Sequence, residues 1–166
     1  MSRWFRTYGY VPVLEHLVIG AYPLDAGDVE MLQWMGIDRV LNLVQDSEYT
    51  DGEREEVSGA LLSLGIEERR VELVDHGDLP AEALEHASQQ VLGWLDEGRR
   101  VYLHCRAGWQ RSAAVAAAVI ALRDGTDIAE ALERVRQRKP SADPLPHQRE
   151  DLLRWWNGRE VRRADG

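Results

Sequence analysis

Cys105 and Arg111 are the two residues of this chain whose types and spacing most directly indicate chemistry. They stand six positions apart in the segment His104–Ser112 (HCRAGWQRS), and Cys105 is the only cysteine. A thiolate is a strong nucleophile. A guanidinium presents a planar fork that can bind two oxygens of one phosphate group. The pair therefore indicates nucleophilic attack on a phosphate.

The elements expected on either side of this segment predict how it is shaped. The apolar run Val101–Leu103 predicts a strand that delivers Cys105, and the alanine-rich run from Ala113 predicts a helix that begins near Arg111. Gly108 allows a sharp turn between them. The amide groups of such a turn form a nest for anions, and the helix N-terminus adds unpaired N–H groups and its dipole. We expect the phosphate to be bound by Arg106, Ala107, Gly108, Trp109, Gln110 and Arg111.

Two neighbours of Cys105 are expected to support its chemistry. Positive potential at a helix N-terminus favours the thiolate form of a cysteine. Ser112 can donate a hydrogen bond to that sulfur, and His104 is expected to fix the loop through its ring nitrogens rather than act as a base. The alternative is that Cys105 is an ordinary core residue, because free cysteines are among the most buried residue types. The combination of strand, Gly108, Arg111 and helix favours the phosphate loop.

This chain carries the pattern His104-Cys105-x-x-Gly108-x-x-Arg111-Ser112. The pattern resembles the signature of the cysteine-dependent protein tyrosine phosphatases. The chain is more similar to the small dual-specificity branch, because the segment 135–156 is similar to that branch's "R-x-x-R-P … L-x-x-W" ending. The likeness runs from about Val18 to Trp156. It implies a metal-independent, cofactor-free enzyme that hydrolyses phosphate monoesters through a phosphocysteine intermediate. The implied substrate is a phosphorylated protein or a small phosphate monoester.

Phosphate transfer to Cys105 also requires a proton for the departing oxygen. A general acid contributes about a hundred- to ten-thousandfold to such a step. Asp75 and Asp78 both lie in the loop expected after residues 70–74. Asp75 is favoured because it directly follows the strand, and because Asp75, a short turn and Pro80 resemble the acid loop of the phosphatase family. Asp78 is the alternative acid, and either residue could simply form the turn.

Several other functions use a similar loop. A phosphoinositide or other non-protein phosphatase is the first alternative, although the loop has Arg106 and no lysine. A catalytically inactive phosphate-binding module is the second, and it is disfavoured because nucleophile, arginine and acid are all present. A rhodanese-like role does not account for the Gly-x-x-Arg-Ser ending. A reductase would require further cysteines.

Composition limits the partners of the chain. The net charge of −9 disfavours nucleic acid and anionic membranes as partners. The longest uncharged apolar run, 113–122, is too short to insert across a bilayer, which takes about 20 residues. A single cysteine allows no internal disulfide and fits a reducing compartment, so we expect a cytoplasmic location. The spacing of the histidines indicates no metal site, and the oligomeric state is left open.

The alternation of expected elements predicts an α/β fold with a central, mainly parallel sheet flanked by helices. The length suits one phosphatase domain, residues 1–166, with a core at about 18–156 and a frayed tail at about 159–166. Short β pieces are expected between Trp4 and Tyr22, and longer strands at 39–44, 70–74 and 101–104. Helices are expected at 26–35, 51–64, 81–97, 111–123, 127–138 and 146–158.

Overall fold

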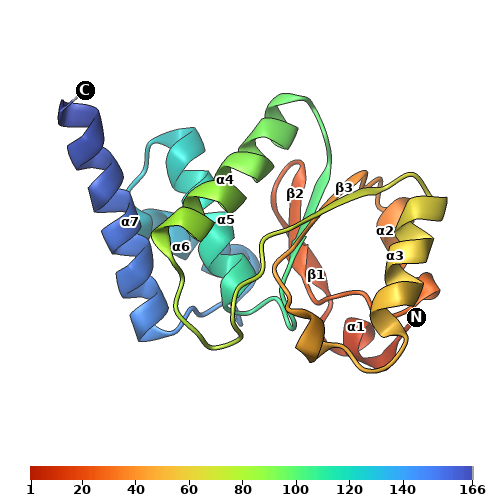
Figure 1. Ribbon diagram of the computed structural model, residues 1–166. Helices are drawn as coiled ribbons and strands as arrows, with labels where there is room; N and C mark the ends of the chain where they lie inside the picture. Colours follow the sequence, from red (N-terminus) through yellow and green to blue (C-terminus); the bar gives the residue numbers. More distant parts are fainter. Residues whose placement is uncertain (166) are drawn as a thin grey trace.

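A five-stranded sheet stands between two groups of helices in the computed structural model, which describes residues 1–165, and side chains for 1–159 (Figure 1). The strand order is β1-β2-β5-β3-β4. Only β1 and β2 pair antiparallel, and the other three pairings are parallel. The predicted α/β fold with a mainly parallel sheet is therefore confirmed. The strands are β1 (Tyr10–Leu14), β2 (Leu17–Gly20), β3 (Arg39–Asn42), β4 (Glu67–Arg70) and β5 (Val101–His104).

The helices divide between the two faces of the sheet (Figure 1). Helices α1 (Arg3–Tyr8), α2 (Ala26–Trp34) and α3 (Glu53–Ser63) cover one face. The other face is covered by α4 (Ala81–Asp96), α5 (Arg111–Asp124), α6 (Ile128–Arg138) and α7 (Pro146–Asp165). Each face has its own apolar core, so β5 in the middle of the sheet is buried on both sides.

Helix α5 is the most enclosed helix of the fold. Every residue from Arg111 to Ala121 is buried, because α5 packs against the sheet and against α4, α6 and α7. Its many alanines let these neighbours approach closely. The N-terminus of this helix is therefore fixed in the interior at the carboxyl end of β5, which is where open parallel sheets bind ligands.

Three elements differ from the sequence prediction. The fourth strand is Glu67–Arg70 rather than 70–74, because an edge strand can carry charged residues and so lacks the apolar run that the prediction required. The segment after it still runs beside β3, where the amides of Val71 and Leu73 donate to the carbonyls of Asn42 and Leu43.

The helix α1 was not predicted, because its six residues are rich in aromatic side chains that are typical of strands. The last helix was predicted to end at Gly158 and the tail to fray, yet α7 continues to Asp165. Beyond Gly158, Arg159 pairs with Glu85 of α4 and its guanidinium lies 5.5 Å from the centre of the Trp155 ring. These contacts compensate for the poor helix propensity of glycine.

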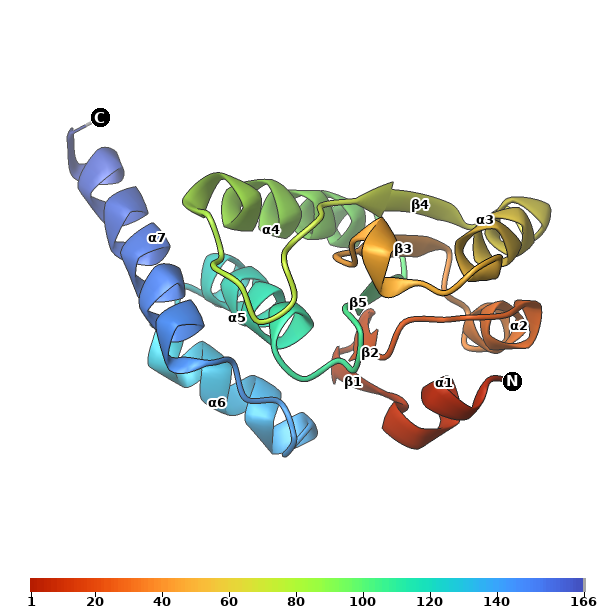
Figure 2. The same cartoon turned by 60° about the horizontal axis from the view of Figure 1, so that its bottom comes forward.

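The buried carboxylate of Asp28, in α2, holds the start of α1. It accepts hydrogen bonds from the backbone amide of Ser2 (2.7 Å), the hydroxyl of Ser2 (2.6 Å) and the amide of Leu24 (2.9 Å). Asp28 is fully buried, so these three donors replace the water that a carboxylate would otherwise bind. The attachment places α1 next to the loop that joins β5 to α5 (Figure 2).

Replacing Asp28 by alanine is expected to lower the free energy of unfolding by about 1–3 kcal/mol, because three partly buried donors lose their acceptor. Urea unfolding of Asp28→Ala measures this loss. The control is Glu30→Ala, which removes an exposed carboxylate from the same helix and is expected to change stability by less than about 0.5 kcal/mol. Equal effects of the two substitutions would contradict the anchoring role of Asp28.

Candidate active site

The loop between β5 and α5 holds Cys105 and Arg111 at the carboxyl end of β5. Strand β5 ends at His104, and α5 begins at Arg111. Gln110 precedes the helix and makes no side-chain cap, so the first N–H groups of α5 remain available to an anion. The expected strand, turn and helix all form at the predicted residues.

Gly108 fixes how this loop lies on the sheet. Its φ is +78°, a conformation that favours glycine. A Cβ at Gly108 would lie 2.7–2.9 Å from backbone atoms of Gly20, the last residue of β2. The loop thus packs directly on the backbone of β2, and only glycine fits at this contact.

Cys105 is buried beside Ser112. The two side chains approach to 3.3 Å between Sγ and Oγ, so the serine hydroxyl can donate a hydrogen bond to a thiolate. Both residues lie where the sequence predicted them, on opposite sides of the turn.

The side chain of Arg111 is only 1% exposed, and it makes more hydrogen bonds than any other side chain of the site. Its guanidinium donates to both carboxylate oxygens of Glu48, at 2.7 and 2.9 Å, and to the carbonyl of Leu73 at 3.0 Å. Burial opposes the charge, but the hydrogen bonds that the guanidinium donates to Glu48 and the nearby acidic groups outweigh it and raise the pKa of Arg111. Within the described residues, Nε of Arg111 is buried without a hydrogen-bond partner, so this donor is available to an oxyanion.

Glu48 is a site residue that the sequence analysis missed. It lies on a short 3-10 turn, Asp46–Glu48, which is 63 positions away from Arg111. Asn42 holds this turn: its Oδ1 accepts from the amide of Val44 at 2.7 Å and its Nδ2 donates to the Tyr49 hydroxyl at 2.9 Å. The only local signal is the spacing of Gln45 and Glu48, which form a capping box, and this spacing does not reveal the pairing with Arg111.

Of the two candidate acids, the structure brings Asp75 to the cysteine and leaves Asp78 outside. Asp75 lines the same cavity as Cys105, and its Oδ1 lies 3.1 Å from the guanidinium of Arg111. The side chain of Asp78 is 87% exposed, against 30% for Asp75, and its nearest basic group is His147 at 4.0 Å. The loop geometry therefore favours Asp75.

The cavity above Cys105 has a volume of about 330 Å³. Its walls come from three parts of the chain: the loop 105–111, the acid loop with Asp75 and His76, and helix α1 with Trp4 and Tyr8. The predicted residues Arg106, Ala107, Trp109 and Gln110 all line it. Trp4 and Tyr8 were missed, because no pattern near them in the sequence indicates a contact with the loop.

Trp4 also shapes the loop itself. Its indole Nε1–H donates to the carbonyl of Arg106 at 2.7 Å, and the amide of Tyr22 donates to the same carbonyl at 3.2 Å. A carbonyl facing a bound phosphate would repel it. These two donors occupy the Arg106 carbonyl and so offset part of its negative potential.

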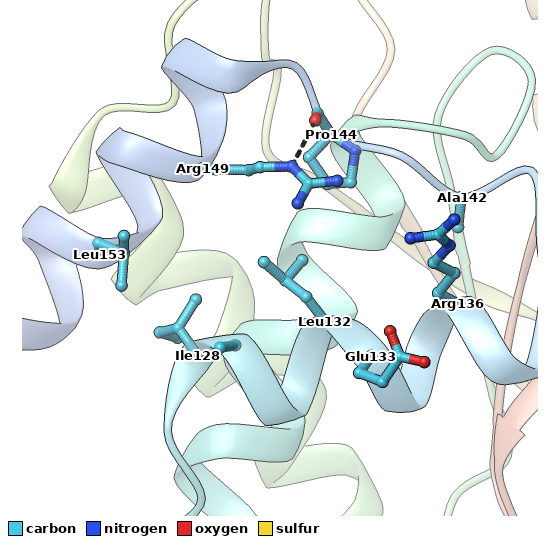
Figure 3. Close-up of a pocket in the computed structure, with 9 residues that line it drawn as sticks. Ile128, Leu132, Glu133, Arg136, Ala142, Pro144, Arg149 and Leu153 are labelled. Atoms are coloured by element: carbon cyan, nitrogen blue, oxygen red, sulfur yellow. Dashed lines mark hydrogen bonds between the residues drawn. The ribbon is translucent and has the colours of Figure 1, made fainter.

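A second cavity, of about 230 Å³, lies between α6 and the start of α7 (Figure 3). Ile128, Leu132 and Leu153 form its apolar part, and Arg149 beside it donates to the carbonyl of Pro144 at 3.0 Å. It contains none of the predicted site residues, so the candidate active site is the cavity at Cys105. The part of the chain that the structure describes contains no group of three or more His, Cys, Asp or Glu residues arranged for a metal. Within the same residues, no helix combines the length and apolar character needed to cross a bilayer.

Residues 17–157 match the family model described as "Dual specificity phosphatase, catalytic domain". The chain belongs to this family of cysteine-dependent phosphatases. It is 29% identical over 144 residues to the Arabidopsis thaliana protein named Protein-tyrosine-phosphatase IBR5. The matched region is 87% of this chain and 49% of IBR5, so the chain spans about half the length of that relative.

Solved structures share the fold over nearly the whole chain. A mutant form of Tk-PTP superposes with a TM-score of 0.81 at 23% identity, covering 92% of this chain and 97% of that one. PTPMT1 gives a TM-score of 0.80 at 24% identity, covering 95% and 100%. Human DUSP28 gives 0.72 at 22% identity, covering 91% and 95%.

His104, next to Cys105, makes the free energy of unfolding of the protein depend on pH. It is fully buried, and its Nδ1 donates to the carbonyl of Cys105 at 3.2 Å. Burial lowers the pKa of His104 to about 3. The unfolded chain, with an ordinary histidine pKa of about 6.5, therefore binds more protons between these two values, and stability falls as the pH is lowered through that window.

The free energy of unfolding is accordingly expected to fall by up to about 1.4 kcal/mol per pH unit below about pH 6.5 on account of His104 alone. Urea unfolding at several pH values between about 7.5 and 5 measures this slope. His104→Asn keeps a donor near the Cys105 carbonyl and removes the titrating ring, so its slope is shallower than that of the wild type. The exposed His86 provides the control, since His86→Asn retains the wild-type slope. Parallel slopes for the wild type and His104→Asn would contradict this assignment.

Proposed function

We propose that this protein hydrolyses phosphate monoesters, with Cys105 as the nucleophile. The observation that carries the proposal is the shared cavity, in which the buried thiol, the bonded guanidinium of Arg111 and the carboxylate of Asp75 converge. The loop amides and Arg111 bind the phosphate and stabilise the charge that its oxygens carry in the transition state. Membership of the dual specificity phosphatase family supports the same chemistry.

The first step transfers the phosphoryl group to the enzyme. The Cys105 thiolate attacks phosphorus, an S–P bond forms, and the bond between phosphorus and the ester oxygen breaks. Asp75 donates its proton to that departing oxygen, so the alcohol leaves neutral. Asp75 lines the same cavity as Cys105, so a leaving group bound there can reach it.

The second step hydrolyses the phosphocysteine and regenerates the Cys105 thiolate. A water molecule attacks the phosphocysteine, Asp75 now accepts the proton of that water, and the S–P bond breaks to release inorganic phosphate. The hydroxyl of Ser112, 3.3 Å from Sγ, stabilises the departing thiolate. Gln110 lines the cavity and can orient the water.

A phosphorylated protein is the substrate that we favour, and both phosphotyrosine and phosphothreonine are compatible with the family. The relative IBR5 is named a protein tyrosine phosphatase, which supports this preference. A phosphoinositide is the second candidate, because one structure similar to this chain is PTPMT1 in complex with PI(5)P. We place the enzyme in the cytoplasm, as its single cysteine indicates.

Cys105→Ser is expected to abolish turnover, because a serine hydroxyl has no comparable anion to attack phosphorus. Release of phosphate from an aryl phosphate, assayed with a metal chelator present, measures the loss. Binding of inorganic phosphate to Cys105→Ser is retained, because Arg111 and the loop amides remain. Turnover by Cys105→Ser at the wild-type rate would refute the phosphocysteine mechanism.

Asp75→Asn is expected to lower kcat by about a hundred- to ten-thousandfold, because the departing oxygen no longer receives a proton. Asp78→Asn is the matched control and keeps kcat close to that of the wild type. A large loss in Asp78→Asn with a small one in Asp75→Asn would reverse the assignment of the acid.

A further inference from the structure

Three aromatic side chains from two distant parts of the chain meet at the wall of the catalytic cavity. Trp4 and Tyr8 come from α1, and Trp109 comes from the phosphate loop. The ring centres of Trp4 and Tyr8 are 4.3 Å apart, and those of Tyr8 and Trp109 are 5.4 Å apart in an edge-to-face arrangement. All three line the cavity that contains Cys105. We call Trp4, Tyr8 and Trp109 the aromatic wall.

The aromatic wall is fixed at both ends of α1. At the start of the helix, Ser2 bonds to the buried Asp28. At the end, the carbonyl of Tyr8 accepts a hydrogen bond from Nζ of Lys139 at 3.3 Å, and Lys139 is itself buried. A wall that is already ordered loses little conformational entropy when a ligand packs against it.

The members of the wall differ in what they leave exposed. Trp4 is engaged by Arg106, whose carbonyl accepts its N–H and whose guanidinium lies 5.2 Å from the centre of its ring. Trp109 is 41% exposed, and Tyr8 beside it is half-buried. Tyr8 and Trp109 therefore present apolar ring surface at the cavity.

We propose, on the basis of the proposed phosphatase function, that Tyr8 and Trp109 select phosphate esters of aromatic alcohols. The phosphate sits on the loop and the ester oxygen faces Asp75, so the group attached to that oxygen extends along the walls of the cavity. A flat ring there contacts Tyr8 and Trp109 by edge-to-face or offset packing. The short aliphatic group of a phosphothreonine buries less surface against them.

This selection acts on binding. The ring makes the same contacts before and during phosphoryl transfer, and such uniform binding changes KM rather than kcat. Tyr8→Ala is therefore expected to raise KM for an aryl ester by about three- to tenfold. The ratio of kcat/KM for phosphotyrosine to kcat/KM for phosphothreonine, in peptides of one flanking sequence, falls by the same factor.

Inhibitors separate binding from the reactivity of the leaving group. Phenylphosphonate is expected to inhibit the wild type more strongly than methylphosphonate, and Tyr8→Ala removes most of this difference. Inhibition by inorganic phosphate reports on the loop and stays at the wild-type level in Tyr8→Ala. Trp109→Ala is the second variant and shifts the phenylphosphonate inhibition in the same direction.

Two control variants test whether the aromatic ring of Tyr8 is the cause. Tyr8→Phe keeps the ring and retains the wild-type selectivity. Trp34→Ala removes an 81% exposed tryptophan from α2, away from the cavity, and also retains it. Equal losses on both peptides in Tyr8→Ala, together with weaker inhibition by inorganic phosphate, would show a supporting role in the fold and overturn the proposal.

The failure of this proposal is distinguishable from failure of the phosphatase mechanism. A wild type that turns over both peptides but shows unchanged selectivity in Tyr8→Ala refutes only the aromatic wall. Greater efficiency on a phosphoinositide in detergent micelles than on the phosphotyrosine peptide also refutes it. Turnover that persists in Cys105→Ser refutes the mechanism on which both proposals rest.

Discussion

The buried guanidinium of Arg111 is the constraint on which the rest of the site depends. A charge in the interior is costly unless it is paired and hydrogen-bonded. Arg111 meets this requirement through Glu48, the carbonyl of Leu73 and Asp75, which bring two separate segments to the start of α5. The charge that binds phosphate therefore also holds the acid loop and the 3-10 turn in place.

The same arrangement links the acid to the substrate. Asp75 lies 3.1 Å from the guanidinium that a phosphate would also contact. One cation therefore positions both the phosphate and the proposed acid. Glu48, bonded to two guanidinium nitrogens, stays to balance the charge of Arg111.

The sequence could predict those parts of the site that are formed by residues close together in the chain. The strand, the turn at Gly108 and the helix after Arg111 follow one another in the chain, so periodicity and glycine placement reveal them. Glu48 and the aromatic side chains of α1 contact the loop from 63 and 102 positions away, as Arg111 with Glu48 and Arg106 with Trp4 show. Such contacts arise from tertiary packing and leave no local pattern. The edge strand β4 was placed too late for a different reason, because its residues Glu67–Arg70 are all charged and form no apolar run.

The walls of the catalytic cavity come from inside and outside the region that the family model matches. The family match begins at residue 17, so it includes Cys105, Arg111 and Asp75 but leaves out α1. Yet α1 contributes a wall of the cavity and a hydrogen bond to the carbonyl of Arg106. The shared region is constrained by the geometry of phosphoryl transfer, whereas a short helix docked through Asp28 and Lys139 can change its exposed side chains without disturbing that geometry. In the proposed selection of aryl esters, Tyr8 of α1 therefore acts from outside the matched region, together with Trp109 from inside it.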